Sequence, residues 1–548
     1  MSSPPDVFAR LEQLNRIGAA LSKERDINSL LESILIAAMN LTRADGGTLY
    51  LMNAARDALD FTIMRNNSME IELGGTTGKA IELPSLPLYR PDGTANDSMV
   101  AVWAVQHDRT VNVADAYEEA GFDFSGTRLF DARMHYRSRS FLTMVMKDHE
   151  DEIVGVLQLI NAIDHQTGQT IAFSQADQSL AESLTSQAAI ALTTRRLIVQ
   201  QEQLFESFIG MINTAIDEKS PYTGGHCQRV PELTMMLAEA TTQCAVGPLA
   251  SFHMSERDRY ELKIAGLLHD CGKITTPVHV VDKATKLETI FDRIALVEAR
   301  YEIFKRDARI RALEQQLALR PEQDAAAESA LAQACVQELA ELNAEFEFLR
   351  RCNTGGEAMR AEDQDRIRAI ARARQWRNRL DATQPGLSED EVENLTIKAG
   401  TLTAMERQEI NNHIISTIRM LEALPWPRHL TNVPEYAGGH HERMDGKGYP
   451  RGLKADQMSL QARMMAVADI FEALTASDRP YKPGMPLSRA MDILAGFARN
   501  GHIDPDLFEV FVRYRVFQQY GQRFLKPNQI DAVDVERVLA AARPPVTT

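Results

Sequence analysis

The sequence predicts a multidomain protein in which an α+β domain, with an antiparallel sheet and flanking helices, is joined by a long helix to an all-α helical bundle. Three observations predict this. At 548 residues the chain is too long for one ordinary hydrophobic core. Its first part changes from helical to strand-like periodicity and back. Beyond residue 206 the pattern is nearly all helical.

The N-terminal domain, residues 1–195, is predicted from this change of period. Apolar residues recur at three- and four-residue spacing between Leu11 and Ala38. Strand-like runs follow at 47–52, 59–64, 140–147 and 152–161, separated by polar or glycine-bearing turns. We therefore expect a sheet with helices before and after it.

Residues 179–215 are predicted to form a linker helix that overlaps both domains, because no glycine or proline occurs from residue 179 to residue 209. Apolar residues are spaced by roughly three or four positions at Leu180, Leu184, Ala188, Ala191, Ile198 and Phe205. Two interpretations stay open. The helix packs on its own domain, or it forms a parallel coiled coil that makes the protein a homodimer.

The C-terminal domain is predicted to span residues 206–535, with a helical insertion at about 286–398. The insertion is rich in Ala, Glu, Arg and Gln, as in RALEQQLALR and DRIRAIARARQWRNRL. Charged helical runs of this kind are usually solvated faces. We expect two or three long helices that serve as structure or as an interaction surface.

Charge and cysteine usage exclude several classes of protein. A formal charge of −16 argues against a general binder of nucleic acid or acidic membranes, which needs clustered Lys and Arg. A small anionic substrate is compatible with this charge if metal ions supply local positive charge.

The five cysteines lack the spacing of a disulfide framework, which argues against a secreted disulfide-rich protein. The start of the sequence lacks the pattern of a signal peptide. The best apolar run, Leu30 to Leu41, is too short to span a bilayer, so we expect a cytoplasmic protein.

Histidine and aspartate gather in the C-terminal half in a pattern that predicts a metal site. A single helical histidine is more often a core residue than a ligand, but a buried carboxylate such as Asp469 needs a cation or strong donors. Side chains from several helices can converge in a bundle core, and imidazole with carboxylate suits Fe, Mn, Zn or Co. The candidate ligands are His226, His269, Asp270, His413, His440, His441 and Asp469.

The motifs around these residues resemble the HD-GYP family. The HD doublet stands in HDCGK, Gly448-Tyr449-Pro450 stands in HHERMDGKGYP, and ADIFEALTASDRPYK follows. The doublet alone is a weak motif, but the ordered series is specific. The resemblance covers nearly all the chain after residue 206 except the insertion.

The resemblance implies two divalent ions, with Fe or Mn favoured. One ion would be held by His226, His269, Asp270 and Asp469, and the other by His413, His440 and His441 with Asp270 bridging. Some family members hold a third ion on a carboxylate one helical turn before the first histidine. Tyr222 stands at that place, and Asp217 and Glu218 lie a further turn away, so a two-ion site is favoured.

The implied activity is hydrolysis of cyclic di-GMP to pGpG and/or GMP by a hydroxide that bridges the ions. Asp270 and Lys273 are the expected catalytic residues, with Lys273 at the scissile phosphate or the leaving oxygen; the alternative for Lys273 is a solvated surface side chain. The expected substrate contacts are Lys273, Arg443, Tyr449 (stacking on guanine), and Arg479 and Lys482 (at the second phosphate). Asp445 is expected to organise its loop.

Cys227 and Cys271 each come directly after a candidate metal ligand. Adjacent residues of a helix are about 100° apart, so the two thiols should not point at the same metal, and we expect both side chains in the core.

The N-terminal domain resembles GAF domains in VNVADAYEEAGFDFS, HYRSRSFLTMVM and GVLQLINA. Of an Asn-Lys-Phe-Asp-Glu signature, Asn161, Phe173 and Asp177 are present, while Ala162 and Gln178 replace the other two. These losses leave a small-molecule ligand and a pure dimerisation role as alternatives. Because no cysteine precedes Cys227, a cofactor attached here through a thiolate or thioether is excluded.

Two other functions compete with cyclic di-GMP hydrolysis. One is hydrolysis of another cyclic dinucleotide such as cyclic GMP-AMP, since nothing in the sequence separates guanine from adenine. The other is a signalling module that binds a cyclic dinucleotide or a protein partner without turnover. The complete set of candidate ligands argues against the second.

Overall fold

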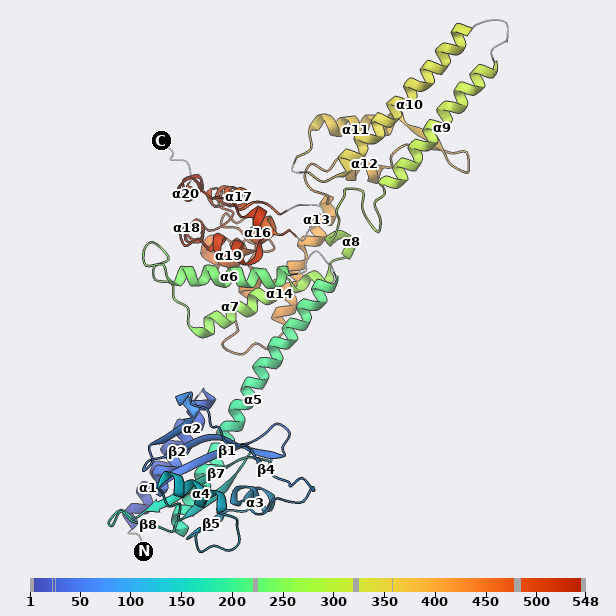
Figure 1. Cartoon of the computed structure of the whole chain (residues 1–548). Helices are drawn as coiled ribbons and strands as arrows, with labels where there is room; N and C mark the ends of the chain where they lie inside the picture. Colours follow the sequence, from blue (N-terminus) through green and yellow to red (C-terminus); the bar gives the residue numbers. More distant parts are fainter. Residues whose placement is uncertain are drawn as a thin grey trace. The chain divides into compact units, whose positions relative to one another are not determined.

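The computed structural model describes residues 4–21, 23–24, 26–219, 225–318, 325–356, 358–477 and 484–543 (Figure 1). The chain divides into two compact units, Met1–Glu206 and Ser207–Thr548. Helix α5 (Gln175–Lys219) is continuous across the boundary. The first unit combines an antiparallel sheet with helices and the second is mainly helical, so the predicted fold class is confirmed.

The first unit is built on a sheet in which all neighbouring strands are antiparallel. Its main path runs β3-β2-β1-β7-β6-β5, with β4 paired to β2 and β8 paired to β7. The strands are β1 (Ala44–Met52), β2 (Ala58–Asn66), β3 (Ile71–Gly74), β4 (Leu86–Pro87), β5 (Val111–Val113), β6 (Phe141–Lys147), β7 (Ile153–Ile163) and β8 (Thr170–Ile171). The helices are α1 (Pro4–Leu21), α2 (Ile27–Thr42), α3 (Val100–His107), α4 (Ser125–Met134) and the start of α5.

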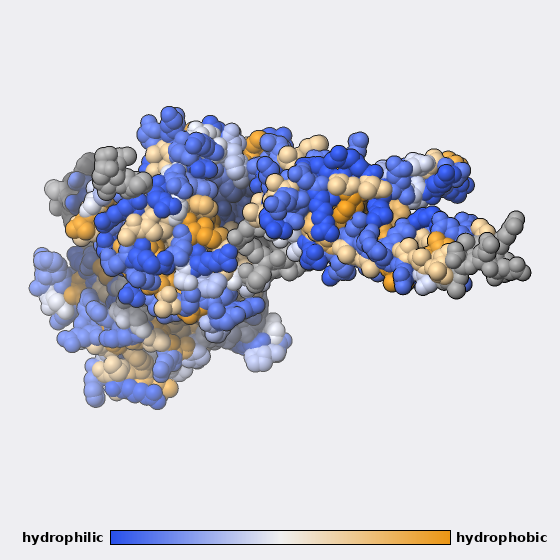
Figure 2. Space-filling view, turned by 90° about the horizontal axis from the view of Figure 1, so that it is seen from above, coloured by the Kyte–Doolittle hydropathy of each residue, from blue (hydrophilic) through white to orange (hydrophobic). Residues whose placement is uncertain are grey.

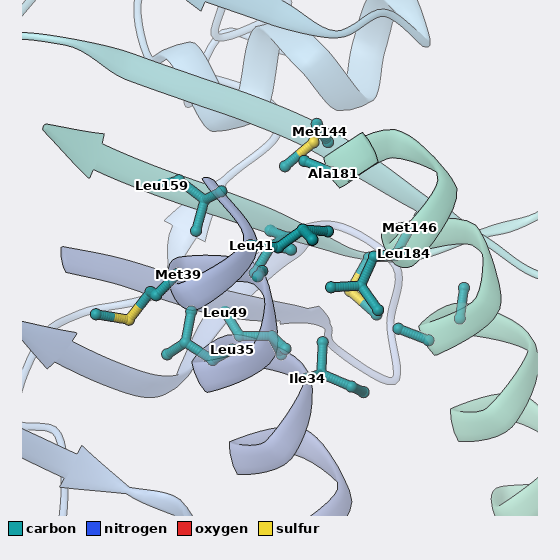
Figure 3. Packing of buried hydrophobic residues seen from close by; sticks show 14 of the residues in the cluster. Ile34, Leu35, Met39, Leu41, Leu49, Met144, Met146, Leu159, Ala181 and Leu184 are labelled. Carbon is teal, nitrogen blue, oxygen red and sulfur yellow. The ribbon is translucent and has the colours of Figure 1, made fainter. Parts of the chain in front are cut away.

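The core of this unit lies between the sheet, α2 and the first turns of α5. Ile34 and Leu35 of α2, Leu159 of β7 and Leu184 of α5 are fully buried there (Figure 3). Helix α2 is started by Asp26, whose carboxylate accepts a hydrogen bond of 2.7 Å from the Ser29 amide. The predicted strand runs correspond to β1, β2, β6 and β7.

The second unit is a helical bundle interrupted by an insertion. Its bundle helices are α6 (His226–Thr242), α7 (Glu256–Leu268), α8 (Val278–Val281), α13 (Ala404–Asn411), α14 (His413–Glu422), α15 (Val433–Gly438), α16 (Leu460–Thr475), α17 (Leu487–Arg499), α18 (Pro505–Arg513), α19 (Val516–Phe524) and α20 (Val535–Ala542). The short helical turn η2 (Cys271–Thr275) follows α7. No helix in the described ranges is both long and apolar enough to cross a membrane.

The insertion has its own small hydrophobic core. Helices α9 (Ile294–Ala318) and α10 (Ala325–Asn353) lie side by side and antiparallel, followed by α11 (Ala361–Ala373) and α12 (Glu389–Leu395) (Figure 1). A two-stranded sheet of β9 (Gln375–Arg377) and β10 (Thr383–Pro385), which the sequence pattern did not predict, lies between the last two helices in sequence. Buried residues from all four helices form one cluster. The visible surface of the insertion is mainly hydrophilic, as solvated helices require (Figure 2).

Candidate metal centre

The seven predicted ligands come together in the second unit, mostly at the ends of helices. His226 opens α6, His269 and Asp270 follow the last turn of α7, His413 opens α14, His440 and His441 follow α15, and Asp469 lies within α16. Five of the seven are buried, while His441 and Asp469 are partly exposed. Helix ends suit this arrangement because short helices can direct their terminal side chains to one point without placing long polar faces in the core.

Asp270 is the common neighbour of three histidines. Its Oδ2 atom lies 3.1 Å from Nε2 of His226 and 3.3 Å from Nε2 of His269. Its Oδ1 atom lies 3.2 Å from Nε2 of His413. The two oxygens of one carboxylate thus face two different sets of imidazoles.

Two groups of ligand atoms result, and they share Asp270. One group contains His226, His269 and Asp270, and the other contains Asp270, His413, His440 and His441. Asp469 adjoins the first group, with Oδ1 3.4 Å from Nε2 of His226. Within the second group, the Nε2 atoms of His413 and His441 are 3.2 Å apart.

Three of the histidines are held in the same way by the backbone. In each, Nδ1 lies at hydrogen-bonding distance from the carbonyl oxygen three residues earlier, which can only accept, so Nδ1 carries the proton. Nε2 is then left as a lone-pair donor that faces the centre. The pairs are His269 with Gly266 (2.7 Å), His440 with Ala437 (2.6 Å), and His413 with Ile410.

The inward atoms fit a cation. Nε2 of His269, Nε2 of His440 and Oδ1 of Asp270 are buried and have no hydrogen-bond partner among the described residues. Burial lowers the pKa of His440 to about 4, so its ring is neutral at physiological pH. Buried acceptors without donors are costly, and a metal ion satisfies several at once. Imidazole and carboxylate donors of this kind bind divalent transition metals.

Glu472 and Arg229 complete the centre, and the sequence reasoning missed both. Nδ1 of His226 lies 2.6 Å from Glu472 Oε2, and Arg229 donates to the other oxygen of that carboxylate at 2.8 Å. Although burial alone would raise it, His226 and Arg229 hold the pKa of Glu472 at about 2. Its position one helical turn after Asp469, within an apolar helix, was the signal that could have revealed it.

The carboxylates around His226 make this place attractive to positive charge. Burial opposes the charged imidazole, but Glu472 and the two aspartates outweigh burial and raise the pKa of His226 well above its usual value. A proton on His226 and a metal ion compete for the same negative surroundings.

Lys273 points to the centre from η2. Its ammonium group contacts Oδ2 of Asp270, and the Asp270 carboxylate overcomes the effect of burial and raises the pKa of Lys273. The turn that carries Lys273 is itself held by Lys219, the last residue of α5. The Lys219 ammonium group donates to the carbonyl oxygens of Ile274 and Thr276, the latter at 2.6 Å.

The loop after His441 is ordered by carboxylates. Glu442 is buried and accepts from the amides of Arg451 (2.7 Å) and Leu453 (2.9 Å). Asp445 binds the Arg443 guanidinium at 2.9 Å and, as expected of an organiser of the loop, accepts from the Lys447 amide at 3.0 Å. Arg443 is therefore engaged within its loop.

Tyr449 stacks on His441, with ring centroids 4.8 Å apart and planes at 26°. This places the tyrosine ring beside one of the candidate ligands. The other two predicted substrate contacts, Arg479 and Lys482, lie outside the described residues, and so does Tyr222.

Cys227 and Cys271 are buried beside the centre. Burial raises the pKa of the Cys227 thiol to about 12 and that of Cys271 to about 11. Neither belongs to a group of ligand atoms found among the described residues. Asp217 is not in those groups either; its carboxylate accepts from the Gly225 amide at 3.4 Å, and burial raises its pKa.

In the first unit, the three signature residues support the fold. The Asn161 side chain accepts from the amides of Arg139 (2.7 Å) and Ser140 (3.2 Å), which joins β7 to the segment before β6. Phe173 is buried in the core. Asp177 accepts from the Ser174 hydroxyl at 2.6 Å at the start of α5.

Comparisons with known families agree with the division of the chain into two units. A GAF domain model matches residues 26–192, and HD domain models match residues 223–335 and 386–507. The chain contains a GAF domain and an HD domain. The HD match to residues 386–507 begins within the insertion, and residues 336–385 lie between the two HD matches. HD domains are metal-dependent, and the clusters of this HD domain can hold metal.

Curated relatives share the HD region. The chain is 47% identical over 90 residues to 3'3'-cGAMP-specific phosphodiesterase 1 of Vibrio cholerae, covering 16% of this chain and 20% of that protein. It is 43% identical over 116 residues to the cyclic di-GMP phosphodiesterase PA4108 of Pseudomonas aeruginosa, covering 21% and 27%. The chain thus spans about a quarter or less of these two relatives. Among solved structures, the GAF domain of an Acinetobacter phosphoenolpyruvate-protein phosphotransferase matches at 16% identity and a TM-score of 0.26, covering 36% of this chain and 99% of that one.

Proposed function

We propose that this protein is a metal-dependent phosphodiesterase that hydrolyses cyclic di-GMP to pGpG and/or GMP under the control of its GAF domain. The observation that carries the proposal is the position of Asp270, whose two oxygens face two groups of inward-pointing histidine Nε2 atoms. The relative PA4108, 43% identical over the matched segment, is named a cyclic di-GMP phosphodiesterase.

The proposal assigns two divalent ions to the centre; the mixed donor set suits Fe, Mn, Zn or Co, and the resemblance to the HD-GYP family favours Fe or Mn. His226, His269, Asp270 and Asp469 would hold one ion, and His413, His440 and His441 the other, with Asp270 shared. When bound, such ions supply the positive charge and Lewis acidity that attack of water on a phosphodiester requires.

The protein's own groups act around the phosphate. Lys273, charged and tied to Asp270, is placed to neutralise charge on the phosphoryl group or the leaving oxygen. Tyr449 offers an aromatic face next to His441 for a base. Arg479 and Lys482 are retained as candidates for the second phosphate, and Arg443 as a loop cation near the site.

The direct test is anaerobic purification with Fe(II) or Mn(II), followed by chromatography of cyclic di-GMP incubated with the wild type and Asp270→Asn. We expect metal-dependent formation of pGpG or GMP, reduced at least a hundredfold in the variant. Glu202→Lys, an exposed change on α5, serves as a control that keeps activity. Absence of turnover at full metal occupancy would reject the enzymatic proposal in favour of a binding module.

One observation supports 3'3'-cGAMP as a second candidate substrate. The relative that is 47% identical over 90 residues is named specific for 3'3'-cGAMP. The same incubation with 3'3'-cGAMP in place of cyclic di-GMP decides between them through the ratio of kcat/KM values.

A further inference from the structure

The insertion contains a pocket that the proposed phosphodiesterase reaction does not use. The pocket has a volume of about 320 Å³, within the usual range for sites that bind small molecules. It is formed by residues that precede α9, end α10, begin α11 and follow α12. Ten of its twelve described lining residues fall in residues 336–385, between the two HD matches, while Lys286 and Lys398 lie within those matches.

The lining of this pocket is strongly cationic. Only one carboxylate, that of Asp363, is present among the described lining residues. The cationic lining residues are Lys286, Arg351, Arg360, Arg366 and Lys398. In a chain with a formal charge of −16, such convergence of positive charge from separate segments is unexpected for a surface that only needs solvation.

Three of these cations have unused hydrogen-bond donors. Within the described ranges, the side chains of Arg351 and Lys398 make no hydrogen bond or ion pair, and both are exposed. The guanidinium carbon of Arg366 lies 4.1 Å from the ring centroid of Phe348. This contact orients the guanidinium plane and leaves its N–H groups available to bind a ligand.

The remaining two cations build the frame of the pocket. The buried Lys286 ammonium group donates to the carbonyl oxygens of Leu395 (3.1 Å) and Ile397 (2.8 Å), which joins the start of the insertion to its end. Arg360 binds Asp363 at 3.0 Å.

We propose that this pocket binds a small phosphorylated molecule carrying several negative charges. Arginine offers a planar fork to phosphate oxygens and lysine a mobile point charge, and both kinds face the same hollow. The insertion would then be a ligand-binding module separate from the GAF domain.

Inorganic pyrophosphate is the probe for the test, titrated calorimetrically into the full-length protein freed of metal by chelation and dialysis. The variant Arg351→Glu/Lys398→Glu changes two exposed, unpartnered cations of the pocket and should retain the thermal stability of the wild type. The matched control is Arg350→Glu/Arg368→Glu, which reverses two exposed charges on α10 and α11 outside the pocket lining. We expect saturable binding that weakens at least tenfold in the pocket variant and changes less than twofold in the control.

Cys352 provides an independent readout, because it is one of the residues that line the pocket. Bound pyrophosphate should slow alkylation of Cys352 severalfold and leave alkylation of Cys335, outside the lining, unchanged. Citrate serves as a carboxylate comparison. Lack of saturable binding up to 10 mM, equal weakening in the control, or binding of citrate without pyrophosphate would each overturn the proposal.

Discussion

Glu472 fixes the direction in which His226 presents its Nε2 atom. The carboxylate binds Nδ1 at 2.6 Å and is itself held by Arg229. Partners of this kind orient metal-ligating imidazoles and increase their basicity. The structure therefore gives a role to a residue that belongs to none of the groups of ligand atoms.

We predict that Glu472→Gln lowers metal affinity by roughly 10–100-fold, the usual effect of losing such a partner. The glutamine keeps the volume but loses the charge that favours a proton or an ion at His226. Metal content measured by mass spectrometry after dialysis against a weak chelator tests this. Glu435→Gln, which changes a carboxylate on α15 outside the centre, is the control; equal retention of metal by both variants would contradict the prediction.

The thiols next to the candidate ligands should be inert. With pKa values of about 12 and 11, Cys227 and Cys271 are protonated at pH 8, where roughly one Cys227 thiol in ten thousand is a thiolate. Only the thiolate is nucleophilic, so reactivity should rise as the pH approaches those values. Iodoacetamide labelling at pH 8, followed by peptide mass spectrometry, should modify the more exposed Cys335 first. Rapid labelling of Cys227 in folded protein would show that the burial argument fails.

At the scale of elements, the contact between η2 and α14 sets the distance between Asp270 and His413. A Cβ atom on Gly272 would lie 2.0 Å from the His413 carbonyl oxygen and 2.5 Å from the Thr417 amide nitrogen. The Gly272 amide also donates to the Thr417 hydroxyl at 2.9 Å. Glycine is required here because two backbones approach each other closely.

We expect Gly272→Ala to cost about 1–3 kcal/mol of stability, as overpacking does, and to reduce metal binding by moving α14. Gly496→Ala is the control, because a Cβ there meets nothing within 4 Å and an alanine inside a helix should stabilise by about 0.5–1 kcal/mol. Thermal denaturation of both variants, with and without Mn(II), tests this. An unchanged Tm in Gly272→Ala would show that η2 and α14 can separate without loss.

At the scale of the whole molecule, α5 carries an exposed apolar stripe. Ile190, Leu197, Leu204 and Met211 recur every seven residues and are 48%, 51%, 71% and 58% exposed. An apolar residue at every seventh position fills one of the two seam positions of a coiled-coil heptad. We therefore propose that two copies of the chain associate in parallel through α5, the second of the two interpretations that the sequence left open.

The prediction is a dimer in sedimentation velocity that becomes a monomer in Leu197→Glu/Leu204→Glu. Charges placed in the seam repel each other and lose apolar burial. Glu202→Lys, about 140° around the helix from Leu197, should remain a dimer. A monomeric wild type at micromolar concentration would contradict this proposal.

The sequence by itself determined the class of each domain and the chemical character of the centre. Periodicity places helices and strands because it reports which side of an element meets the core, and the type and order of the His and Asp residues indicate metal chemistry. Neither depends on long-range geometry. The inward direction of the Asp469 carboxylate could likewise be predicted from the sequence, because the neighbours of Asp469 on its helix are apolar.

Only the tertiary structure decided which atoms meet. Pairing of β1 with β7 joins residues more than a hundred positions apart, and the hydrogen bond from Arg229 to Glu472 spans 243 positions. Local patterns carry no information on such contacts, since they arise from how helices pack. For the same reason the basic pocket could not be predicted: its cations come from segments that look like ordinary solvated helices, and only the packing of the insertion brings them together.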